Sequence, residues 1–448
     1  MDLGWWILYR FYRLSSWIGH AGRRRFTRAG WMVLIAVALT ALMGPDTDNS
    51  VAYQAFTLLL FLIAVAIASS WSFRARFSAT RRLPRFGTVG SPLAYQMRVR
   101  NLTSRPQSGL SLLDDLADPR PTFRDWRATR VAEDKRIRSF RVSNRRKPRK
   151  FRLATLKEAA VGPMVPGGEA EVRVEVTPLR RGVLRFAGAT LACSDPLGLY
   201  RAMTRVALPQ STLILPKRYP LPPAALPGVL KYQEGGVAFA SNVGQSEEFV
   251  ALRDYRHGDP LRHIHWRSWA KVGKPVVKEF EDEFFVRHGL VLDTFTEDPQ
   301  SEVFEEAVSV AASFAASVLT QESLLDLLFV GAQSYCFTAG RGLAHSDQML
   351  EILAGVSASH DQKFSVLEHL VLTHVDAISG CICVLLAWDE ARQSFVKKLK
   401  TLGLPLMVLV ITEPGQGSNL KPGPMEDELE QFHVLEAGRV EQGLANLR

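Results

Sequence analysis

The sequence predicts a multi-domain α+β protein with three parts: an N-terminal pair of apolar helices, a β-sandwich-like domain and a doubly wound α/β domain. Two apolar runs without charge lie within the first 75 residues. Alternating strands separated by turn residues dominate residues 86–215. From about residue 286, buried strands alternate with helical periodicity. The length of 448 residues is also more than one hydrophobic core holds.

Residues 1–25 are expected to form an amphipathic helix in the interface plane of a membrane. Aromatic residues are mixed there with Arg10 and Arg13, a composition that suits the headgroup region. The aromatic residues are Trp5, Trp6, Tyr9, Phe11, Tyr12 and Trp17.

Residues 26–75 are expected to form a two-helix transmembrane hairpin. Its apolar runs, 30–43 and 51–71, are separated by a polar turn. As helices they would span about 21 Å and about 31 Å, so only the second covers a bilayer core without its flanks. A helical hairpin buried in a soluble core is the alternative. A cleaved signal peptide fits poorly, because a second apolar run follows the first.

Basic residues flank the outer ends of the two runs, whereas the turn between them carries only Asp46 and Asp48. The flanking residues are Arg23, Arg24, Arg25, Arg28, Arg74, Arg76, Arg81 and Arg82. By the positive-inside rule, both termini and the soluble domains are expected on the cytoplasmic side.

Residues 86–215 are expected to form a small antiparallel sandwich. The segments with alternating polarity are Leu93–Asn101, Arg136–Ser143, Glu171–Thr177, Val183–Leu191 and Leu199–Leu208.

A basic insertion, residues 120–152, interrupts this domain. It holds fourteen basic against three acidic residues, a net charge of +11, while the whole chain carries +10. A solvated loop, an anchor on anionic lipid and a nucleic-acid patch are the three interpretations. The membrane hairpin favours lipid, and sparse aromatic residues disfavour nucleic acid. The expected lipid-facing residues are Arg145, Arg146, Lys147, Arg149 and Lys150.

A proline-rich linker, residues 216–245, leads into a dense charged and aromatic segment, residues 246–285. This segment predicts a strand, a turn, a short helix over 261–271 and a second strand. Asp259 is expected to cap the helix, and its neighbouring arginines to form an ion-pair network with it. Such a network is the structural alternative to a catalytic site.

The same segment resembles the signature of the DUF58 family, F-x-x-L-R-x-Y-x-x-G-D-x-x-R-x-I-x-W-x-x-x-A. The matching positions are Phe249, Leu252, Arg253, Tyr255, Gly258, Asp259, Arg262, Ile264, Trp266 and Ala270, with His265 before the tryptophan. Arg181-Gly182 and the run from Asp195 to Leu199 resemble the R-G and D-P-L-G-L elements of the family.

Residues 286–448 resemble the von Willebrand factor A fold, which the family resemblance also implies. Asp293 and Asp389 end two predicted strands, and parallel sheets bind ligands at that edge. The fold often holds Mg²⁺ through D-x-S-x-S, but Phe295 and Glu297 replace both serines here. Asp293 and Asp389 with waters could supply part of a Mg²⁺ site; strand-end aspartates that cap helices are the alternative.

Enzyme signatures are otherwise missing from the sequence, and four cysteines are too few for a disulfide framework. Cys381 and Cys383 are expected on one face of a buried strand rather than on a metal. We therefore expect a non-enzymatic adaptor. The resemblance implies a bacterial inner-membrane protein whose partners are a MoxR-type AAA+ ATPase and a transglutaminase-like membrane protein. A metal-dependent enzyme using Asp293 and Asp389 and a basic nucleic-acid-binding membrane protein are the competing hypotheses.

Overall fold

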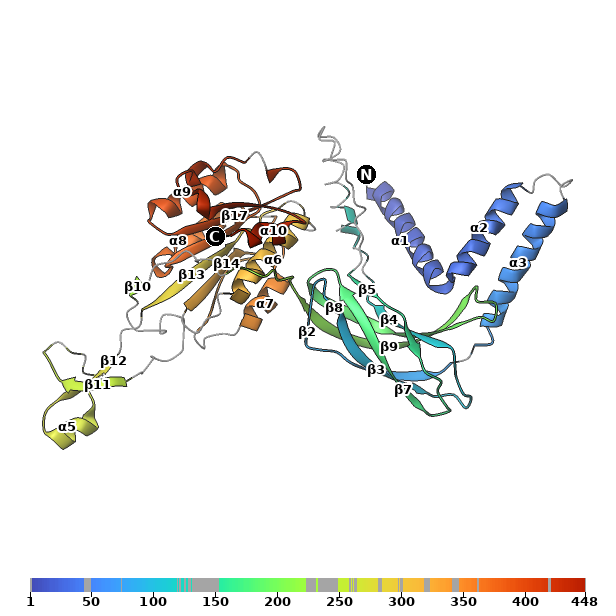
Figure 1. Cartoon of the computed structure of the whole chain (residues 1–448), viewed down its shortest axis with the longest axis horizontal. Coiled ribbons are helices and arrows are strands. Elements are labelled where there is room, and N and C mark those ends of the chain that lie inside the picture. Colours follow the sequence, from blue (N-terminus) through green and yellow to red (C-terminus); the bar gives the residue numbers. More distant parts are fainter. Residues whose placement is uncertain are drawn as a thin grey trace. The chain divides into compact units, whose positions relative to one another are not determined.

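The computed structural model divides into two compact units, Met1–Lys217 and Arg218–Arg448, each with its own hydrophobic core (Figure 1). It describes residues 2–43, 50–73, 75–118, 120, 122–124, 126–127, 130, 153–222, 231–232, 249–257, 259, 261, 264–280, 284–296, 298, 301–317, 323–340, 346–360, 362–417 and 420–447.

The first unit begins with three helices, α1 (Asp2–Arg25), α2 (Arg28–Met43) and α3 (Ser50–Ser70). Among the described residues, one helix is long and apolar enough to cross a membrane, over Val51–Ser70. The neighbouring helix α2 is apolar but shorter, because its 16 residues rise only about 24 Å. In place of two full spans, the structure has one candidate span with a shorter apolar helix packed against it.

A turn of the β-domain, Asp195–Tyr200, holds the junction of α1 and α2. The Thr27 amide donates to the Leu199 carbonyl (3.1 Å), and the Thr27 hydroxyl donates to the Gly198 carbonyl (2.5 Å). A Cβ atom on Gly30 would lie 2.1 Å from the Leu199 oxygen, so this close approach requires glycine. The D-P-L-G-L element is thus one contact between the helices and the β-domain.

The Asp195 carboxylate shapes that turn. It accepts from the backbone amides of Leu197 (2.9 Å) and Tyr200 (2.6 Å), while Gly198 adopts a left-handed conformation with φ of 68°. Arg25 then donates to the Tyr200 hydroxyl at 2.7 Å. Hydrogen bonds within the turn therefore fix its shape, and Arg25 of α1 contacts the turn from outside.

The β-domain consists of two sheets. One has the order β1 (Phe77–Arg82), β3 (Leu93–Asn101), β7 (Glu169–Pro178), β5 (Ala154–Leu156). The other has the order β2 (Phe86–Thr88), β9 (Arg201–Leu215), β8 (Gly182–Ser194), β4 (Leu110–Leu116), β6 (Ala159–Val161). Neighbours pair antiparallel except β2 and β9, which pair parallel.

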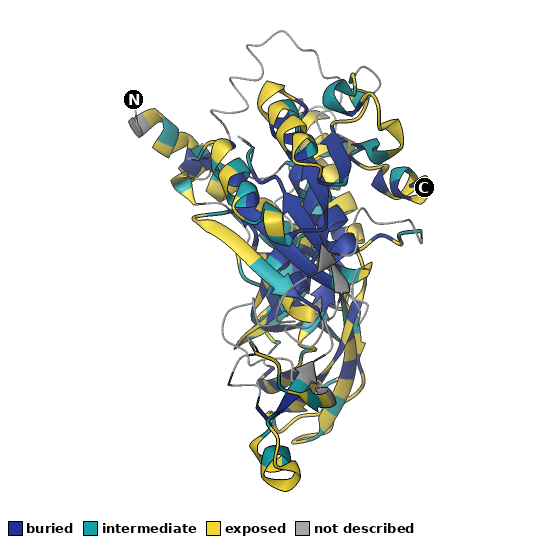
Figure 2. Ribbon diagram, turned by 90° about the vertical axis from the view of Figure 1, so that its left-hand side faces the viewer, coloured by how far each residue is buried: buried dark blue, intermediate teal, exposed yellow. Residues whose placement is uncertain are grey.

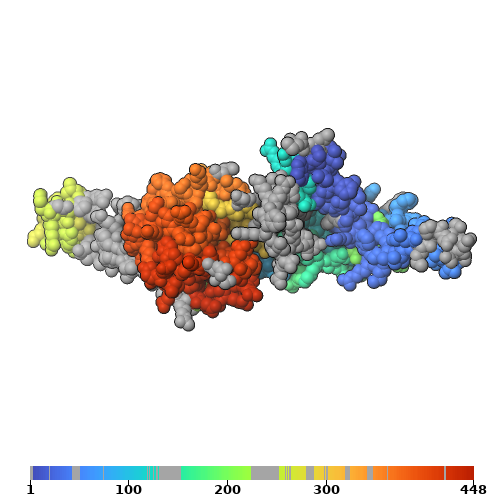
Figure 3. Space-filling view, turned by 90° about the horizontal axis from the view of Figure 1, so that it is seen from above, coloured from blue at the N-terminus to red at the C-terminus, as the bar shows by residue number. Residues whose placement is uncertain are grey.

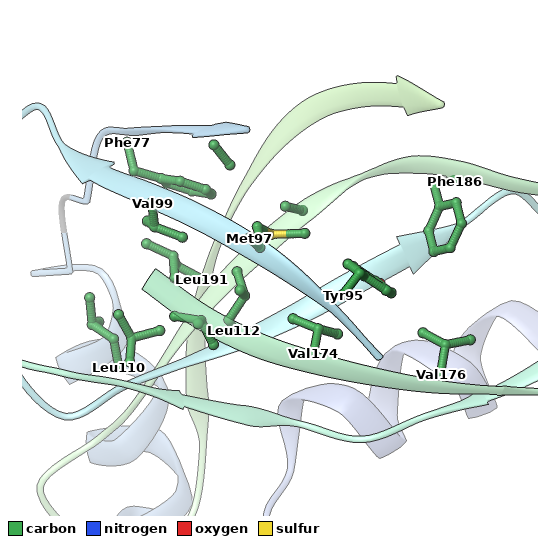
Figure 4. Packing of buried hydrophobic residues seen from close by; sticks show 14 of the residues in the cluster. Phe77, Tyr95, Met97, Val99, Leu110, Leu112, Val174, Val176, Phe186 and Leu191 are labelled. Atoms are coloured by element: carbon green, nitrogen blue, oxygen red, sulfur yellow. The ribbon is translucent and has the colours of Figure 1, made fainter. Parts of the chain in front are cut away.

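The core between these sheets follows from strand alternation. On β3, alternate residues such as Met97 and Val99 point inward and pack with Leu112 and Leu191 (Figure 4). The predicted strand Leu93–Asn101 is confirmed with the same bounds. The predicted strand over 136–143 lies outside the described residues.

The second unit is built on a sheet with the order β15-β14-β13-β16-β17-β18. Its strands are β13 (Phe284–Leu292), β14 (Ser323–Val330), β15 (Ser334–Ala339), β16 (Gly380–Leu385), β17 (Leu406–Thr412) and β18 (Phe432–Glu436). Only the pair β14–β15 on this path is antiparallel. A short strand, β10 (Lys231–Tyr232), pairs antiparallel with β13.

Helices cover both faces of this sheet (Figure 1). They are α6 (Glu302–Ser317), α7 (Ser346–Gly355), α8 (Ser365–Leu372), α9 (Glu390–Thr401) and α10 (Val440–Ala445). Because both faces are covered, β16 and β17 are buried along their whole length, as Figure 2 shows for the sheet. Cys381 and Cys383 lie side by side on the α8–α9 face, as predicted.

The start of the predicted linker packs on this second unit. The Tyr219 amide donates to the Ser313 hydroxyl of α6 at 2.8 Å, and the Tyr219 ring is buried. Residues 223–230 and 233–248 of the linker lie outside the described residues.

Candidate functional site

Strand β11 (Phe249–Asp254) pairs antiparallel with β12 (Val276–Phe280), and the short helix α5 (Trp266–Val272) lies between them in the chain. We call these elements the signature module. The predicted order of strand, turn, helix and strand is confirmed, and the helix begins later than the predicted 261. An isolated bridge from Ile264 to Val277 ties the start of the helix to β12.

A bidentate ion pair braces the turn of the signature module. Arg253 donates to Asp259 through both terminal nitrogens, at 2.7 and 2.9 Å. The Arg256 amide donates to the same carboxylate at 2.8 Å. These hydrogen bonds from Arg253 and Arg256 lower the pKa of Asp259 to about 2. The predicted ion-pair network is therefore present for Arg253 and Asp259.

The expected cap of α5 is wrong. Asp259 is turned toward Arg253, and His265 occupies the N-cap position without a side-chain cap bond. The His265 amide instead donates to the Val276 carbonyl at 2.8 Å, and its Nδ1 lies 2.7 Å from the Ser268 hydroxyl. His265 thus positions the helix against β12.

Apolar side chains of α5 are exposed. Trp266 is 64% exposed and stacks on Trp269, with ring centroids 5.1 Å apart and planes inclined by 18°. Val272 is 61% exposed, and no residue of α5 is buried (Figure 2). We call Trp266, Trp269 and Val272 the tryptophan face. A tryptophan this exposed on a small braced element is typical of an interaction surface.

The structure describes some of the remaining signature residues and not others. Tyr255 is half-buried and its amide donates to the Pro275 carbonyl at 3.0 Å, whereas Leu252 is exposed. Phe249 lies in β11, paired with Phe280. Gly258 and Arg262 lie outside the described residues.

The second predicted site lies where the strand order of the α/β sheet reverses, between β13 and β16. Asp293 directly follows β13 and is fully buried. Its carboxylate accepts from the amides of Phe295 (3.0 Å) and Leu386 (3.1 Å). The side chain therefore ties the ends of β13 and β16 together.

Arg392 of α9 joins Asp293 to Asp389. Its Nε donates to Asp293 at 2.6 Å and its NH1 to Asp389 at 2.6 Å. Asp389 also caps α9 by accepting from the Arg392 amide at 3.0 Å. Burial alone would lower the pKa of Arg392, but the two carboxylates outweigh it and raise that pKa. The guanidinium thus stays charged between them.

This arrangement does not fit Mg²⁺. A magnesium ion requires near-octahedral oxygen ligands, whereas Asp293 is occupied by two amides and a guanidinium. The Thr294 hydroxyl donates to the Val330 carbonyl. Among the described residues, no group of three or more His, Cys, Asp or Glu could hold a metal. Arg392 is the cation that pairs with both carboxylates at this edge.

Sequence reasoning missed Arg392 and Trp269. Each lies three residues after a residue that the sequence analysis singled out, Asp389 and Trp266. On a helix, this spacing brings side chains together, and it is the signal by which both residues could have been found. The five predicted lipid-facing residues, Arg145, Arg146, Lys147, Arg149 and Lys150, lie outside the described residues.

Residues 251–377 match the DUF58 family, described as proteins of unknown function. The matched range begins in β11 and ends before β16. It therefore includes the signature module from Ala251 onward and Asp293, but neither Asp389 nor Arg392.

A relative in Bacillus subtilis (strain 168), the uncharacterized protein YeaD, is 29% identical over 184 residues. The alignment covers 40% of this chain and 44% of YeaD, so the chain spans less than half of that relative.

Two solved structures resemble part of the chain at 10% identity. They are a PapD-like domain of human CEP192 (31% of this chain, 84% of that domain, TM-score 0.17) and a CARDB domain from Pyrococcus furiosus (30%, 94%, TM-score 0.15). At such TM-scores, neither likeness assigns a fold or a function.

Proposed function

We propose that this chain is a membrane-associated adaptor that presents its signature module to a protein partner. The observation that carries the proposal is the exposed tryptophan face beside the Arg253–Asp259 ion pair. The Arg253–Asp259 ion pair fixes the turn, and Trp266 is left exposed with the half-buried Trp269 stacked on it. Rigid aromatic side chains of this kind contribute most of the free energy of binding at interfaces. The proposal assigns no catalytic step to either site.

The membrane part of the proposal places α2 and α3 in the bacterial inner membrane as a hairpin, with the β-domain, the second unit and both termini on the cytoplasmic side. The length and apolar composition of α3 support it, and so does the exposure of four flanking arginines, Arg23, Arg28, Arg76 and Arg82. Two other flanking arginines add less net positive charge beside the membrane than the sequence predicts, because each is paired with an aspartate. Arg24 pairs with Asp115 at 2.6 Å, and Arg81 pairs with Asp114 inside the sandwich.

The proposal also assigns the second unit to the von Willebrand A-like class. The strand order supports this, since β13, the first strand in chain order on the path β15-β14-β13-β16-β17-β18, lies near the centre and β15 is an antiparallel edge. Asp293 and Asp389 lie where that class often binds a metal. In this chain, Arg392 pairs with both carboxylates.

The proposed partner is a MoxR-type AAA+ ATPase, with a transglutaminase-like membrane protein as a further member of the assembly. The resemblance of the signature to DUF58 supports this choice. The basis for contact is chemical: the tryptophan face lies beside Arg267 and Lys271 of the same helix. An apolar pocket with an acidic rim would complement it.

The test is affinity purification of the tagged chain from its native membranes in mild detergent, followed by mass spectrometry. Trp266→Ala removes the centre of the tryptophan face. The matched control is Leu429→Ala, since Leu429 is 59% exposed outside the module. We expect Trp266→Ala to lower recovery of the ATPase at least about tenfold, or ~1.4 kcal/mol, and the control to retain it. Equal recovery with both variants would refute the proposed docking surface.

A further inference from the structure

Helix α1 has one apolar face that is already packed on the protein. Trp126 is 5% exposed and lies against three aromatic residues of α1. Its ring centroid is 6.1 Å from Trp5, 5.6 Å from Tyr9 and 5.9 Å from Tyr12. Tyr9 also contacts Phe123, with ring centroids 5.4 Å apart. The described start of the basic insertion is therefore fixed to the inner side of α1.

The opposite side of α1 is a second apolar face, and it is uncovered. Ile7 (55% exposed), Phe11 (71%), Leu14 (56%) and Ile18 (56%) follow one another at the spacing of a helical stripe. We call these four residues the outer face. Because burying each such side chain is worth about 1.5–3 kcal/mol, an uncovered stripe of this size marks a contact with another apolar phase or partner.

The chain continues from the outer face directly into the apolar helices. Only Phe26 and Thr27 separate α1 from α2, and α2 packs on the candidate span α3. Figure 3 shows α1, in dark blue, continuing into α2 along the surface of this unit. The two helices leave the same junction, which the Asp195–Tyr200 turn holds against the β-domain. If lipid surrounds α2 and α3, that lipid therefore also lies next to α1, which starts from the same junction.

The charges around α1 complement an anionic surface. Arg10 lies over the Trp6 ring at 5.0 Å, and Arg130 over the Trp126 ring at 5.8 Å. Arg124 is exposed on the described start of the basic insertion. Two acids that lie near α1 are paired with arginine: Asp118 with Arg13 (3.5 Å) and Arg120 (3.3 Å), and Asp115 with Arg24 (2.6 Å). Aromatic side chains with arginine above them suit the headgroup layer of anionic lipid.

We propose that the outer face of α1 lies in the headgroup–acyl boundary of an anionic membrane, and that Trp126 holds the start of the basic insertion on the inner side of α1, one helix diameter from that boundary. The inference rests on the proposed membrane association. It adds a second lipid contact, separate from α3, and explains why α1 is apolar on two sides. Described arginines that are held near the membrane in this way, such as Arg124 and Arg130, gain from nearby phosphates at low entropic cost.

The test uses the full-length chain in nanodiscs of phosphatidylcholine, with and without phosphatidylglycerol. A nitroxide is placed at Phe11→Cys or Ile18→Cys, in a background with Cys193→Ser and Cys336→Ser. Arg98→Cys on β3 is the water-exposed control, and Leu58→Cys on α3 is the control for the span. The measured quantity is the accessibility of each label to oxygen relative to a water-soluble nickel chelate.

We expect the ratio of oxygen to nickel accessibility at positions 11 and 18 to exceed that at 98 several-fold, more so with phosphatidylglycerol. If positions 11 and 18 match position 98 while position 58 is in lipid, the inference is wrong and the span stands. If position 58 is also in water, the membrane proposal itself fails. Protection of position 11 in detergent-free oligomers without lipid would assign the face to a second copy and overturn the inference.

A second arm tests Trp126. A label at Arg124→Cys should be relaxed by nickel-chelating lipid headgroups in the disc, and Trp126→Ala should remove most of that relaxation. The control must be an exposed residue, so a residue of the sandwich core such as Phe186 is not suitable. Leu102→Ala is the matched control, since Leu102 is 56% exposed on the β-domain. Equal relaxation in the parent and the Trp126→Ala variant would overturn the role of Trp126.

Discussion

At the scale of single residues, charged side chains in this chain hold turns and strand ends in place. Asp293 was predictable as a strand-end aspartate, and Asp389 as a helix cap, because both features are local. The ion pair between Asp293 and Arg392 was not, since it joins residues 99 positions apart. Local sequence patterns do not show which residues so far apart in the chain come into contact. The difference between a metal site and an internal ion pair depends on this one tertiary contact.

The first prediction concerns Arg392. Replacing it with methionine leaves Asp293 buried without its counter-charge, so we expect a loss of about 3–5 kcal/mol in the free energy of unfolding. Thermal unfolding of the full chain, with Mg²⁺ and with chelator, is the measurement. The unfolding temperature of the parent protein should be the same with Mg²⁺ and with chelator. Mg²⁺ should restore part of the stability that Arg392→Met loses. Stabilisation of the parent by Mg²⁺ would contradict the account.

The second prediction concerns the pH dependence of the Arg253–Asp259 ion pair. The pKa of Asp259 is lowered from 3.8 to about 2. Because a lowered carboxyl pKa stabilises the fold above the unfolded value, the contribution is complete above about pH 4 and is lost as pH falls through about 2. Fluorine NMR of fluorotryptophan-labelled protein, assigned with Trp266→Phe, reports the transition. A midpoint near 4, or the same titration in Asp259→Asn, would argue against this ion pair.

At the scale of elements, alternating polarity predicted strands well. The bounds of β3 were predicted residue for residue, and β7 extends the predicted 171–177 by a few positions. Strand β4 was missed because Asp114 and Asp115 interrupt its apolar pattern. Both are buried, Asp114 with Arg81 and Asp115 with Thr190 at 2.6 Å. Two consecutive aspartates predict a polar loop, because the sequence does not show that their partners on other strands allow them to be buried.

The third prediction concerns the junction of α1 and α2. Gly30→Ala places a Cβ atom against the Leu199 carbonyl, so the Asp195–Tyr200 turn must separate from the helices. We expect tryptic cleavage after Arg24 and Arg25 to become roughly tenfold faster, since local opening then costs ~1.4 kcal/mol less. Gly4→Ala is the matched control, because nothing lies within 4 Å of its Cβ position. Equal cleavage rates in both variants would contradict the close packing.

At the scale of the whole molecule, each unit combines a packed core with exposed apolar side chains, which in the first unit also lie on α2 and α3. In the first unit, the sandwich holds the helices through the Asp195–Tyr200 turn, and the outer face of α1 is uncovered. In the second, the α/β sheet is buried on both sides, and the tryptophan face is uncovered. The account assigns the first surface to lipid and the second to a protein partner.

The decisive measurement is photo-cross-linking in living cells, with a photoreactive amino acid at position 266 of the full-length chain. The adaptor account predicts a discrete cross-linked product with a second protein, identified by mass spectrometry as the ATPase. The same label at position 429 should give no such product, although that site is equally exposed in the same unit. A folded, membrane-associated chain that gives no protein cross-link at position 266 would contradict the central claim.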